Sequence, residues 1–444
     1  MSMSFIIACE SGKRKIAEIL LANKEVDVKY TDEKGRTSLH YAAHQGYLDI
    51  VKLLLEAGAE LDYEDHNGET PFYFACLQKQ KQTALHLLEN GARTDIKDFQ
   101  GNNLLHLTAR TGQKELVDVL LAKGMNADLV NNEAVTPLLV ASAWRNKEIV
   151  QTLIDHGANV NATDKAGNSP LITAVRSKNV PMVTCLIDNG ADVNQTNDAG
   201  ESPLLIACYD TNRAITNLLV EKGADVLITS KNGLSPIWYA CANNQKEIVS
   251  LFLDKGVDVN FSQPLSSATT SMNSYLDWVE SSNSLSMESA FSFNHTYSYG
   301  GESLLHVAAK NGHLSMVKLL LERDAMVNIQ DESGNTALHY AVSCGKKDIV
   351  KYLLEQGADV SIVNTKEQKA IDYAAIKGFN EIATLLLSYQ SPAAQAPVAT
   401  TAPTASQPAT DKKKALMDLK ELLDAGILTQ AEFDAEKAKV LNGK

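Results

Sequence analysis

Glycine recurs along this chain at a fixed step of 33 residues. One register consists of Gly58, Gly91, Gly124, Gly157, Gly190, Gly223 and Gly256. A second consists of Gly35, Gly68, Gly101, Gly167, Gly200 and Gly233, with Ala134 in the one missing place. A fixed period of this length indicates a repeat array, in which each unit is too small to bury its own apolar face and must stack on its neighbours. The period organises nearly all of the chain from Met1 to Tyr389.

Residues 35–67 show what one unit is expected to form. Thr37 is a favoured N-cap for a first helix, and five other copies have proline at the next position, where its missing N–H costs little. Gly46 stands where the chain must turn back and is expected to be left-handed. The apolar residues of 50–55 form the stripe of a second helix. Asn67-Gly68 predicts a tight turn in the loop that leads to the next unit.

Short motifs repeat in the same register as the glycines. Thr37-Ser-Leu-His40 and Thr336-Ala-Leu-His339 are copies of one signature, and Ala-Ala, Val-x-x-Leu-Leu and Gly-Ala-Asp-Val steps accompany them. Together these motifs resemble ankyrin repeats over residues 1–389. The resemblance implies an all-α ankyrin-repeat solenoid of helix–turn–helix units joined by hairpin loops, with about eleven units when both end caps are counted.

The central units depart from this signature at two positions. The histidine is replaced by an apolar residue at Tyr73, Leu139, Ile172, Leu205 and Trp238. The turn glycine is replaced at Lys79, Arg145, Lys178, Thr211 and Asn244. We therefore expect apolar side chains where the family has a Thr–His contact. We also expect strained or remodelled turns, because left-handed geometry at a non-glycine residue costs roughly 1 kcal/mol.

The period breaks after Asn260 and resumes at Gly301. The inserted residues 261–300 are rich in serine, which favours a flexible loop. They also carry several aromatic residues, which favours a loop that folds over the groove or holds a partner. Residues 390–410 are uncharged and rich in Pro, Ala and Thr, a composition typical of a linker.

Residues 411–444 begin a new helical pattern. Thr429 and Glu432 form a capping-box pattern, and the candidate oligomerisation residues are Leu416, Leu419, Leu422 and Leu423 on one helix and Phe433 on the next. The segment resembles the short C-terminal helical module called SHOCT. The resemblance implies a two-helix hairpin that acts in oligomerisation or in assembly close to a membrane.

The formal net charge of −13 lies on the repeats and the insertion, because residues 391–410 are uncharged and residues 411–444 carry equal numbers of lysine and acidic residues. An acidic array argues against nucleic acid as a partner, since phosphate binding depends on Lys and Arg. No stretch has the roughly 20 apolar residues of a transmembrane helix. Cys9, Cys76, Cys208 and Cys241 share one small-residue position and are expected to be buried thiols. A reducing cytoplasm is therefore the expected compartment, and secretion without a leader peptide is the alternative.

Motifs for catalysis or cofactor binding are missing from the sequence. It has no P-loop, no His-Glu-x-x-His, no Gly-x-Ser-x-Gly and no Cys-x-x-Cys. His40, His106, His306 and His339 share one repeat position, and neighbouring helices pack about 8–10 Å apart. That spacing is too wide for a shared metal ion with ligands about 2 Å away. We expect no enzyme activity, no cofactor and no metal.

Two function classes remain. The first is a non-enzymatic scaffold that holds a protein partner on the concave face of the array. The second is an assembly or membrane-associated adaptor that works through the C-terminal hairpin, which could also join copies of the chain into a homo-oligomer. For the scaffold, candidate contact residues occupy loop-tip and helix-end positions, where apolar side chains have no core to fill. They are Phe99, Val135 and Leu234 at the tips, and Arg110, Trp144, Arg176 and Tyr209 at the helix ends.

Overall fold

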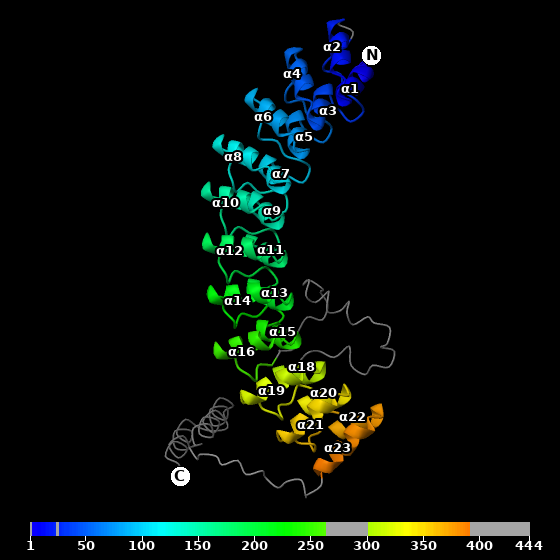
Figure 1. Ribbon diagram of the computed structural model, residues 1–444, viewed down its shortest axis with the longest axis vertical. Coiled ribbons are helices and arrows are strands. Elements are labelled where there is room, and N and C mark those ends of the chain that lie inside the picture. The colour runs from blue at the N-terminus through cyan, green and yellow to red at the C-terminus, as the bar shows by residue number, and fades with distance from the viewer. Residues whose placement is uncertain (1, 24–25, 263–300, 391–444) are drawn as a thin grey trace, which may run out of the picture. The chain divides into compact units, whose positions relative to one another are not determined.

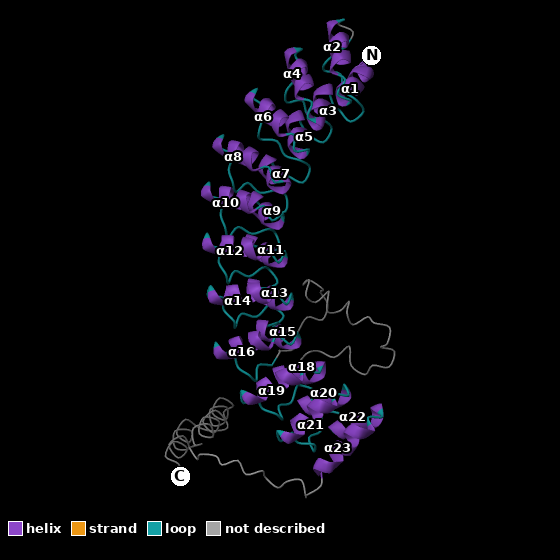
Figure 2. Cartoon of the chain, in the orientation of Figure 1, coloured by secondary structure: helices purple, strands orange, loops and turns teal. Residues whose placement is uncertain are grey.

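The computed structural model describes residues 2–23, 26–262 and 301–390, which belong to one compact unit, Met1–Gln390. Within these ranges the chain forms 22 helices and no named strand. The helices form successive pairs that stack in chain order (Figures 1 and 2). This is the all-α solenoid that the 33-residue period predicts. The predicted C-terminal hairpin and the residues Leu416, Leu419, Leu422, Leu423 and Phe433 lie outside the described residues.

Each pair consists of a first and a second helix. The first helices are α1 (Ser2–Glu10), α3 (Ser38–Gln45), α5 (Pro71–Leu77), α7 (Leu104–Thr111), α9 (Pro137–Ala143), α11 (Pro170–Arg176), α13 (Pro203–Tyr209), α15 (Pro236–Ala242), α18 (Leu304–Asn311), α20 (Ala337–Ser343) and α22 (Ala370–Lys377). The second helices are α2 (Arg14–Ala22), α4 (Leu48–Glu56), α6 (Lys81–Glu89), α8 (Lys114–Ala122), α10 (Lys147–Asp155), α12 (Val180–Asp188), α14 (Arg213–Glu221), α16 (Lys246–Asp254), α19 (Leu314–Glu322), α21 (Lys347–Glu355) and α23 (Asn380–Gln390). First helices pack on first helices and second on second. Within this unit the stack curves toward the first helices, which form what we call the first-helix side (Figure 1).

The first helices begin as the sequence predicts. In α5, α9, α11, α13 and α15 a Ser or Thr is the N-cap, and its hydroxyl accepts a hydrogen bond from the backbone N–H three residues later. Proline occupies the first helical position of each of these five helices. The cap satisfies one of the N–H groups that every helix start leaves without a partner, and proline removes another.

The turns between the two helices of a unit are left-handed whether or not glycine is present. Gly46 has a φ of 79°, as expected. The replacements also have positive φ values of 55–62°: Lys79, Arg145, Lys178, Thr211 and Asn244. These five turns therefore keep the family geometry and hold a non-glycine residue in a disfavoured conformation, which confirms the strained alternative.

Side-chain amides join consecutive units at two levels. At the helix turns, Gln113 Nε2 donates to the carbonyl of Cys76 and Asn146 Nδ2 to that of Ala109, each over 2.6 Å. These bonds satisfy carbonyls at the open end of the preceding first helix. In the loops after the second helices, Asn161 Oδ1 accepts from the N–H of Asp192 over 2.8 Å. Directional bonds therefore fix the spacing between units that apolar packing alone would leave less defined.

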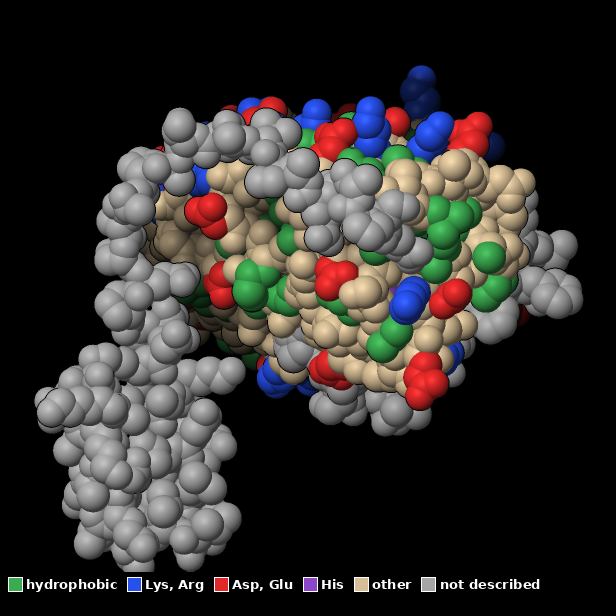
Figure 3. Space-filling view, turned by 90° about the horizontal axis from the view of Figure 1, so that it is seen from below, with side chains coloured by type: hydrophobic (Ala, Val, Ile, Leu, Met, Phe, Trp, Pro, Cys, Tyr) green, Lys and Arg blue, Asp and Glu red, His purple; other side chains and the backbone are tan. Residues whose placement is uncertain are grey.

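The hydrophobic core runs through the whole unit and is less covered at its ends. Ile16 of α2 is 46% exposed, whereas Ile50, the residue at the same position in α4, is 2% exposed. Leu387 of α23 is exposed, whereas its equivalent Leu354 in α21 is buried. Figure 3 views the end that carries α22 and α23, where hydrophobic side chains lie among charged ones. These positions are buried elsewhere because a neighbouring pair covers them.

The two chain segments that flank residues 263–300 meet in space. Ser262 forms an isolated antiparallel bridge with Ser303, and α15 and α16 pack on α18 and α19 as in any other pair of neighbouring units. The repeats on the two sides of the insertion therefore belong to one stack. Residues 263–300 and the linker after Gln390, like the residues of the C-terminal segment, lie outside the described part of the chain.

Candidate protein-binding surface

Two of the predicted contact residues are prominently exposed. Phe99 lies in the loop before α7 and is 78% exposed, and Trp144 caps the C-terminus of α9 and is 59% exposed. Val135 and Arg110 are half-buried. Large apolar side chains in such positions have no core to fill, and aromatic residues are enriched where proteins bind one another.

The Arg176 guanidinium makes two hydrogen bonds to other side chains of the protein. Its Nη2 donates to Oε2 of Glu201 over 2.8 Å, and its Nη1 donates to Oδ1 of Asn168 over 3.0 Å. The Glu201 carboxylate is buried and also accepts from Asn197 Nδ2. Because an unpaired buried carboxylate is costly, the guanidinium is needed where it is. Arg176 thus neutralises Glu201 while part of its side chain faces solvent.

Leu234 does not occupy the exposed position that its place in the repeat predicts. Its side chain is 7% exposed and belongs to the hydrophobic core. Its backbone N–H donates to Oγ of Ser230 over 3.1 Å, which closes the loop at this point. An aliphatic side chain next to apolar neighbours gains free energy by leaving water. Leu234 is therefore removed from the candidate contact residues.

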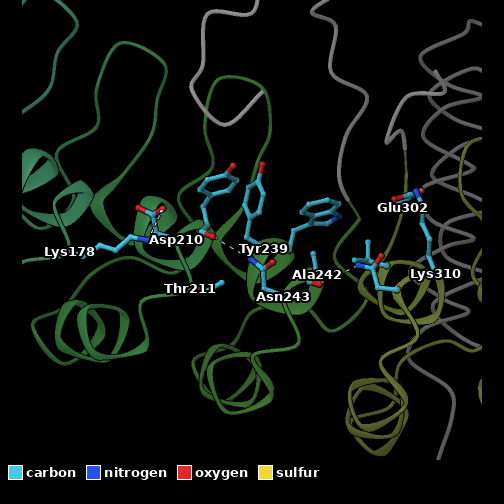
Figure 4. A pocket seen from close by; sticks show the side chains of 12 residues that line it. Lys178, Asp210, Thr211, Tyr239, Ala242, Asn243, Glu302 and Lys310 are labelled. Atoms are coloured by element: carbon cyan, nitrogen blue, oxygen red, sulfur yellow. Dashed lines mark hydrogen bonds and ion pairs between the residues drawn. The ribbon is translucent and has the colours of Figure 1, made fainter. Parts of the chain in front are cut away.

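Tyr209 lies in a groove on the first-helix side, which we call the aromatic groove. Its walls include Tyr209 from the end of α13 and Trp238 and Tyr239 from α15. Glu302, just before α18, and Lys310, within α18, complete the lining (Figure 4). The cavity has a volume of about 490 Å³. Tyr239 makes edge-to-face contacts with Tyr209 and with Trp238, with ring centroids 5.2 Å apart in each pair. The groove thus gathers three aromatic rings from two neighbouring units.

Charged groups stand at both ends of the aromatic groove. Lys178 Nζ lies 3.6 Å from Oδ1 of Asp210, and Lys310 Nζ lies 3.1 Å from Oε1 of Glu302 (Figure 4). Glu302 is 4% exposed, and its second oxygen, Oε2, makes no hydrogen bond to any described group. Burial, followed by the charge of Glu302, raises the pKa of Tyr340, so this carboxylate also faces the tyrosine of the next unit. The groove therefore combines aromatic walls with a buried carboxylate at one end.

Sequence reasoning found only Tyr209 among the walls of this groove. Trp238 was predicted as a substitute for the family histidine, and Tyr239, Glu302 and Lys310 were not singled out. The signal was available in the repeat register. Glu302 directly precedes the cap of α18, and Trp238 and Tyr239 occupy the third and fourth positions after the cap of α15, so stacking of consecutive units brings them together.

The signature histidines are structural. The backbone N–H of Thr37 donates to Nδ1 of His40 over 3.0 Å, so Nε2 carries the proton and donates to the carbonyl of Glu69 in the next unit, 3.1 Å away. Burial lowers the pKa of His40 to about 4. His106, His306 and His339 are likewise buried, and burial lowers the pKa of each. The imidazoles of His40, His106 and His339 bond to backbone groups through both nitrogens and have none free for a metal. Nδ1 of His306 is bonded in the same way, whereas its Nε2 has no hydrogen-bond partner among the described groups.

Near α3 the protein places an arginine of its own on an aromatic ring. The Arg36 guanidinium lies 4.5 Å from the centre of the Phe74 ring. Its Nε lies 2.9 Å from Oδ2 of the buried Asp65, and its Nη2 lies 3.6 Å from Oε2 of Glu69. Ring, guanidinium and carboxylate form a compact set that is stable on the first-helix side of this fold.

The described residues offer few groups that could bind a metal ion or act as a nucleophile. They contain no group of three or more His, Cys, Asp or Glu side chains that could hold a metal ion. Among their helices, none has the length and apolar character needed to cross a membrane. Burial raises the pKa of the Cys76 and Cys241 thiols well above the usual range, which makes them poor nucleophiles. What this part of the chain does offer is an extended surface with exposed and half-exposed aromatic residues.

Stacked helix pairs that repeat at a fixed period define a helical repeat protein. Family models agree. The model for ankyrin repeats (3 copies) matches residues 5–98, 94–164, 171–263, 282–364 and 305–396. This chain belongs to the ankyrin-repeat family, whose repeats are protein–protein interaction modules. The model for the short C-terminal domain, SHOCT, matches residues 414–441.

Two individual proteins are similar to parts of the chain. Palmitoyltransferase akr1 of Schizosaccharomyces pombe is 38% identical over 58 residues, which is 13% of this chain and 9% of that protein. This chain therefore spans less than a tenth of the length of that relative. The crystal structure of the human ASB11 ankyrin repeat domain is 27% identical and covers 50% of this chain and 98% of that domain, with a TM-score of 0.46.

Proposed function

We propose that this protein is a non-enzymatic scaffold that binds a protein partner on the first-helix side of its ankyrin array. The observation that carries the proposal is the exposure of Phe99 and Trp144 on repeat positions where the core needs no side chain. Val135, Arg110 and Tyr209 flank them as half-buried neighbours. Binding would bury these rings at little entropic cost, because an aromatic side chain has few rotatable bonds.

Charge and thiol chemistry indicate the kind of partner and compartment. A net charge of −13 disfavours nucleic acid and favours a partner with a basic surface. The six cysteines are free, and Cys344 is exposed. Exposed free thiols persist best in a reducing compartment, so we propose that the protein works in the cytoplasm. We also propose that binding a protein partner requires no cofactor.

A second candidate function comes from the match of residues 414–441 to the short C-terminal domain. In this alternative the C-terminal segment joins copies of the chain or docks them on an assembly, and the array displays a binding surface. Two short helices alone bury little apolar area. The leucine stripe of Leu416, Leu419, Leu422 and Leu423 would then be completed by another copy or by a partner, together with Phe433.

Affinity capture with two forms of the protein separates these candidates. The full-length chain and the unit Met1–Gln390, which has its own core, are used as baits under identical conditions. The scaffold function predicts one partner retained by both baits at similar yield. Loss of every specific partner from Met1–Gln390 would contradict it and favour the adaptor.

Light scattering tests the assembly role separately. Replacing Leu419 and Leu422 with aspartate introduces charge into an apolar stripe, so it should lower an oligomeric mass to that of one chain. A wild-type chain that is already monomeric at high concentration would remove homo-oligomerisation from consideration. Capture by the Met1–Gln390 bait is unaffected by either result.

A further inference from the structure

One edge of the first-helix side is positively charged, although the chain as a whole is acidic. It consists of the ends of α5, α7, α9 and α11 and the turns that follow them. We call it the turn edge, and its residues are 77–80, 110–113, 143–146 and 176–179. Arg145 Nη2 donates to the carbonyl of Ser177 over 2.6 Å, so a turn contacts the next one along the stack. The turn edge has no Asp or Glu, and its five basic residues are Lys79, Arg110, Arg145, Arg176 and Lys178.

Arg110 and Arg176 occupy the same repeat position, seven residues after the cap, but only Arg176 has a carboxylate partner. The Glu201 carboxylate that bonds Arg176 comes from the next unit, directly before its cap. The residue at the equivalent position beyond Arg110 is Val135, which carries no charge. Among the described residues, no carboxylate lies within ion-pair distance of Arg110. The repeat thus places an arginine where its counter-charge is missing.

The acidic side chains in the surroundings of Arg110 make their bonds elsewhere. Burial, followed by the charges of Asp98 and Glu69, raises the pKa of Tyr73, and the charge of Arg110 opposes the rise. Oδ2 of Asp98 accepts from the Tyr73 hydroxyl over 3.3 Å, and its Oδ1 accepts from two backbone N–H groups of its own loop. Glu69 lies 3.6 Å from Arg36. Neither carboxylate is therefore left over for Arg110.

The Arg110 guanidinium is accessible to a partner. The residue is half-buried, and none of its nitrogens is both fully buried and without a hydrogen bond. Because it makes no hydrogen bond to a described side chain, these nitrogens face water. A half-buried guanidinium attracts a carboxylate more strongly than a fully exposed one, since water screens it less. Its fork of N–H donors fits a carboxylate through two parallel bonds.

An exposed indole and two further cations flank Arg110. The turn that carries Trp144 bonds to the end of α7, next to Arg110. Lys79 and Arg145 are exposed, and neither forms an ion pair with a carboxylate of the described residues. The cations without a counter-charge thus surround a large apolar side chain. Such a surface suits a segment that carries both acidic and apolar residues.

We propose that the turn edge binds an acidic segment of the protein partner, with one of its carboxylates bonded to the Arg110 guanidinium and an apolar side chain against Trp144. This inference rests on the proposed scaffold function and adds the chemistry of one contact to it. The net charge of −13 favours a partner that is basic elsewhere, whereas the turn edge selects acidic residues at this place. A nucleic acid is disfavoured, because the acidic remainder of the array repels a long chain of phosphates.

Short peptides test the proposal on the full-length protein. The probe is an acetylated and amidated peptide of Gly and Ser that has Glu at every third position and one Leu beside the central Glu. Adjacent units lie about 10 Å apart, which is about three residues of extended chain. A matched peptide has Gln in place of each Glu. In NMR titrations up to about 1 mM, the Glu peptide should bind at least about tenfold more tightly, and added salt should weaken it.

Variants then assign the binding to Arg110. Val135→Glu supplies Arg110 with the carboxylate that Glu201 gives to Arg176, so it should weaken the Glu peptide about tenfold. Val135→Gln brings similar bulk without the charge and should bind like wild type. Arg110→Gln should weaken binding as much as Val135→Glu does, and the two effects should not add in the double variant. Lys255→Gln, at an exposed lysine after α16, should leave binding unchanged. Unchanged melting temperatures show that the variants are folded.

Several results would overturn the proposal. Equal binding of the Glu and Gln peptides would remove the role of charge, and absence of binding at about 1 mM would make the turn edge no site. Wild-type binding in both Val135→Glu and Arg110→Gln would place the carboxylate elsewhere. Tighter binding of a single-stranded oligonucleotide or of phosphatidylserine vesicles would make this a phosphate site. The scaffold function itself fails only if substitutions at Phe99 and Trp144 leave partner binding intact, so the two failures can be told apart.

Discussion

Two kinds of repeat unit coexist in this array. The units of α3, α7, α18 and α20 keep the signature histidine and have glycine at the left-handed turn. The units of α5, α9, α11, α13 and α15 have proline at the first helical position, an apolar residue in place of the histidine, and a non-glycine residue at the turn. We call them histidine units and proline units. The three differences occur together in every one of these units.

The comparison shows that the same backbone geometry can be stabilised either by hydrogen bonds or by apolar packing. In a histidine unit, the imidazole of His40 or His339 bonds one backbone group of its own unit and one of the next. In a proline unit the same position holds a buried apolar side chain, such as Leu205. The hydrogen bonds of the histidine units are directional and depend on the charge state of the imidazole. The apolar contacts of the proline units depend only on the apolar area removed from water.

The proline units also carry most of the candidate surface. Trp144, Arg176 and Tyr209 belong to them, as do Trp238 and Tyr239 of the aromatic groove. Replacement of a directional polar contact by apolar packing leaves the first helix free to vary at its exposed end. The part of the array that departs most from the family signature is therefore the part we expect to recognise the partner.

The largest expected effect is the loss of an apolar side chain from a proline unit. Leu205→Ala removes a fully buried side chain of α13 and should cost about 3 kcal/mol of local stability, because the cavity closes only partly. His339→Ala should cost less, about 1–3 kcal/mol, by leaving a backbone N–H and a carbonyl without partners. Hydrogen exchange resolved by peptide measures both. A cost below about 1 kcal/mol for Leu205→Ala would show that this position is not core.

The next effect in size is acid sensitivity confined to the histidine units. The pKa of His40 is about 4 in the folded protein, against about 6.5 in the unfolded chain. The unfolded chain therefore takes up the proton first, so stability falls as the pH is lowered from about 6.5 toward 4 and then levels off. Between pH 7 and pH 5 the loss at His40 is about 2 kcal/mol.

Hydrogen exchange at pH 7 and pH 5, corrected for the intrinsic exchange rate, checks this prediction. Protection should fall around α3 and change less around α11 and α13, which have no histidine at that position. The variant His40→Leu should lose the local pH dependence. Equal loss of protection in both kinds of unit would show that carboxylates, and not the histidines, govern the acid response.

The smallest effect concerns the turns. Thr211 is β-branched and has a φ of 55°, so Thr211→Gly should relieve strain and stabilise the unit by about 0.5–1 kcal/mol after the entropy cost of glycine is subtracted. Gly112→Ala in a histidine unit, at a φ of 78°, should destabilise by about 1 kcal/mol. Urea unfolding monitored by circular dichroism measures the two shifts. Destabilisation by Thr211→Gly would mean that the turn is not strained.

Local backbone features were predictable because one or two residues per unit encode them. Thr70 and Pro71 fix a helix start, and the left-handed turns follow from their place in the period. Even the departures at Leu205 and Thr211 could be placed in advance, since the register assigns each a position. Most helix starts and turns of the described residues could therefore be predicted from the sequence.

Contacts between units were harder to predict. Leu234 occupies a loop-tip position and yet turns into the core. Arg176 is tied to Glu201, 25 residues away, by an ion pair that no local motif announces. Glu302 lines the same groove as Trp238 and Tyr239 only because the stack continues across the insertion. Such contacts depend on which side chains face each other between units, and a period fixes the position of a residue without fixing its partner.

The most direct test of the account is partner binding by two exposed aromatic residues and one matched control. Phe99→Ala and Trp144→Ala should each weaken binding of the partner captured by Met1–Gln390 by about 2 kcal/mol or more, with little change in melting temperature. Leu227→Ala, at a residue 62% exposed in the loop after α14 and outside the tip and helix-end positions, should bind like wild type. Wild-type affinity in both aromatic variants would contradict the claim that the first-helix side is the recognition surface.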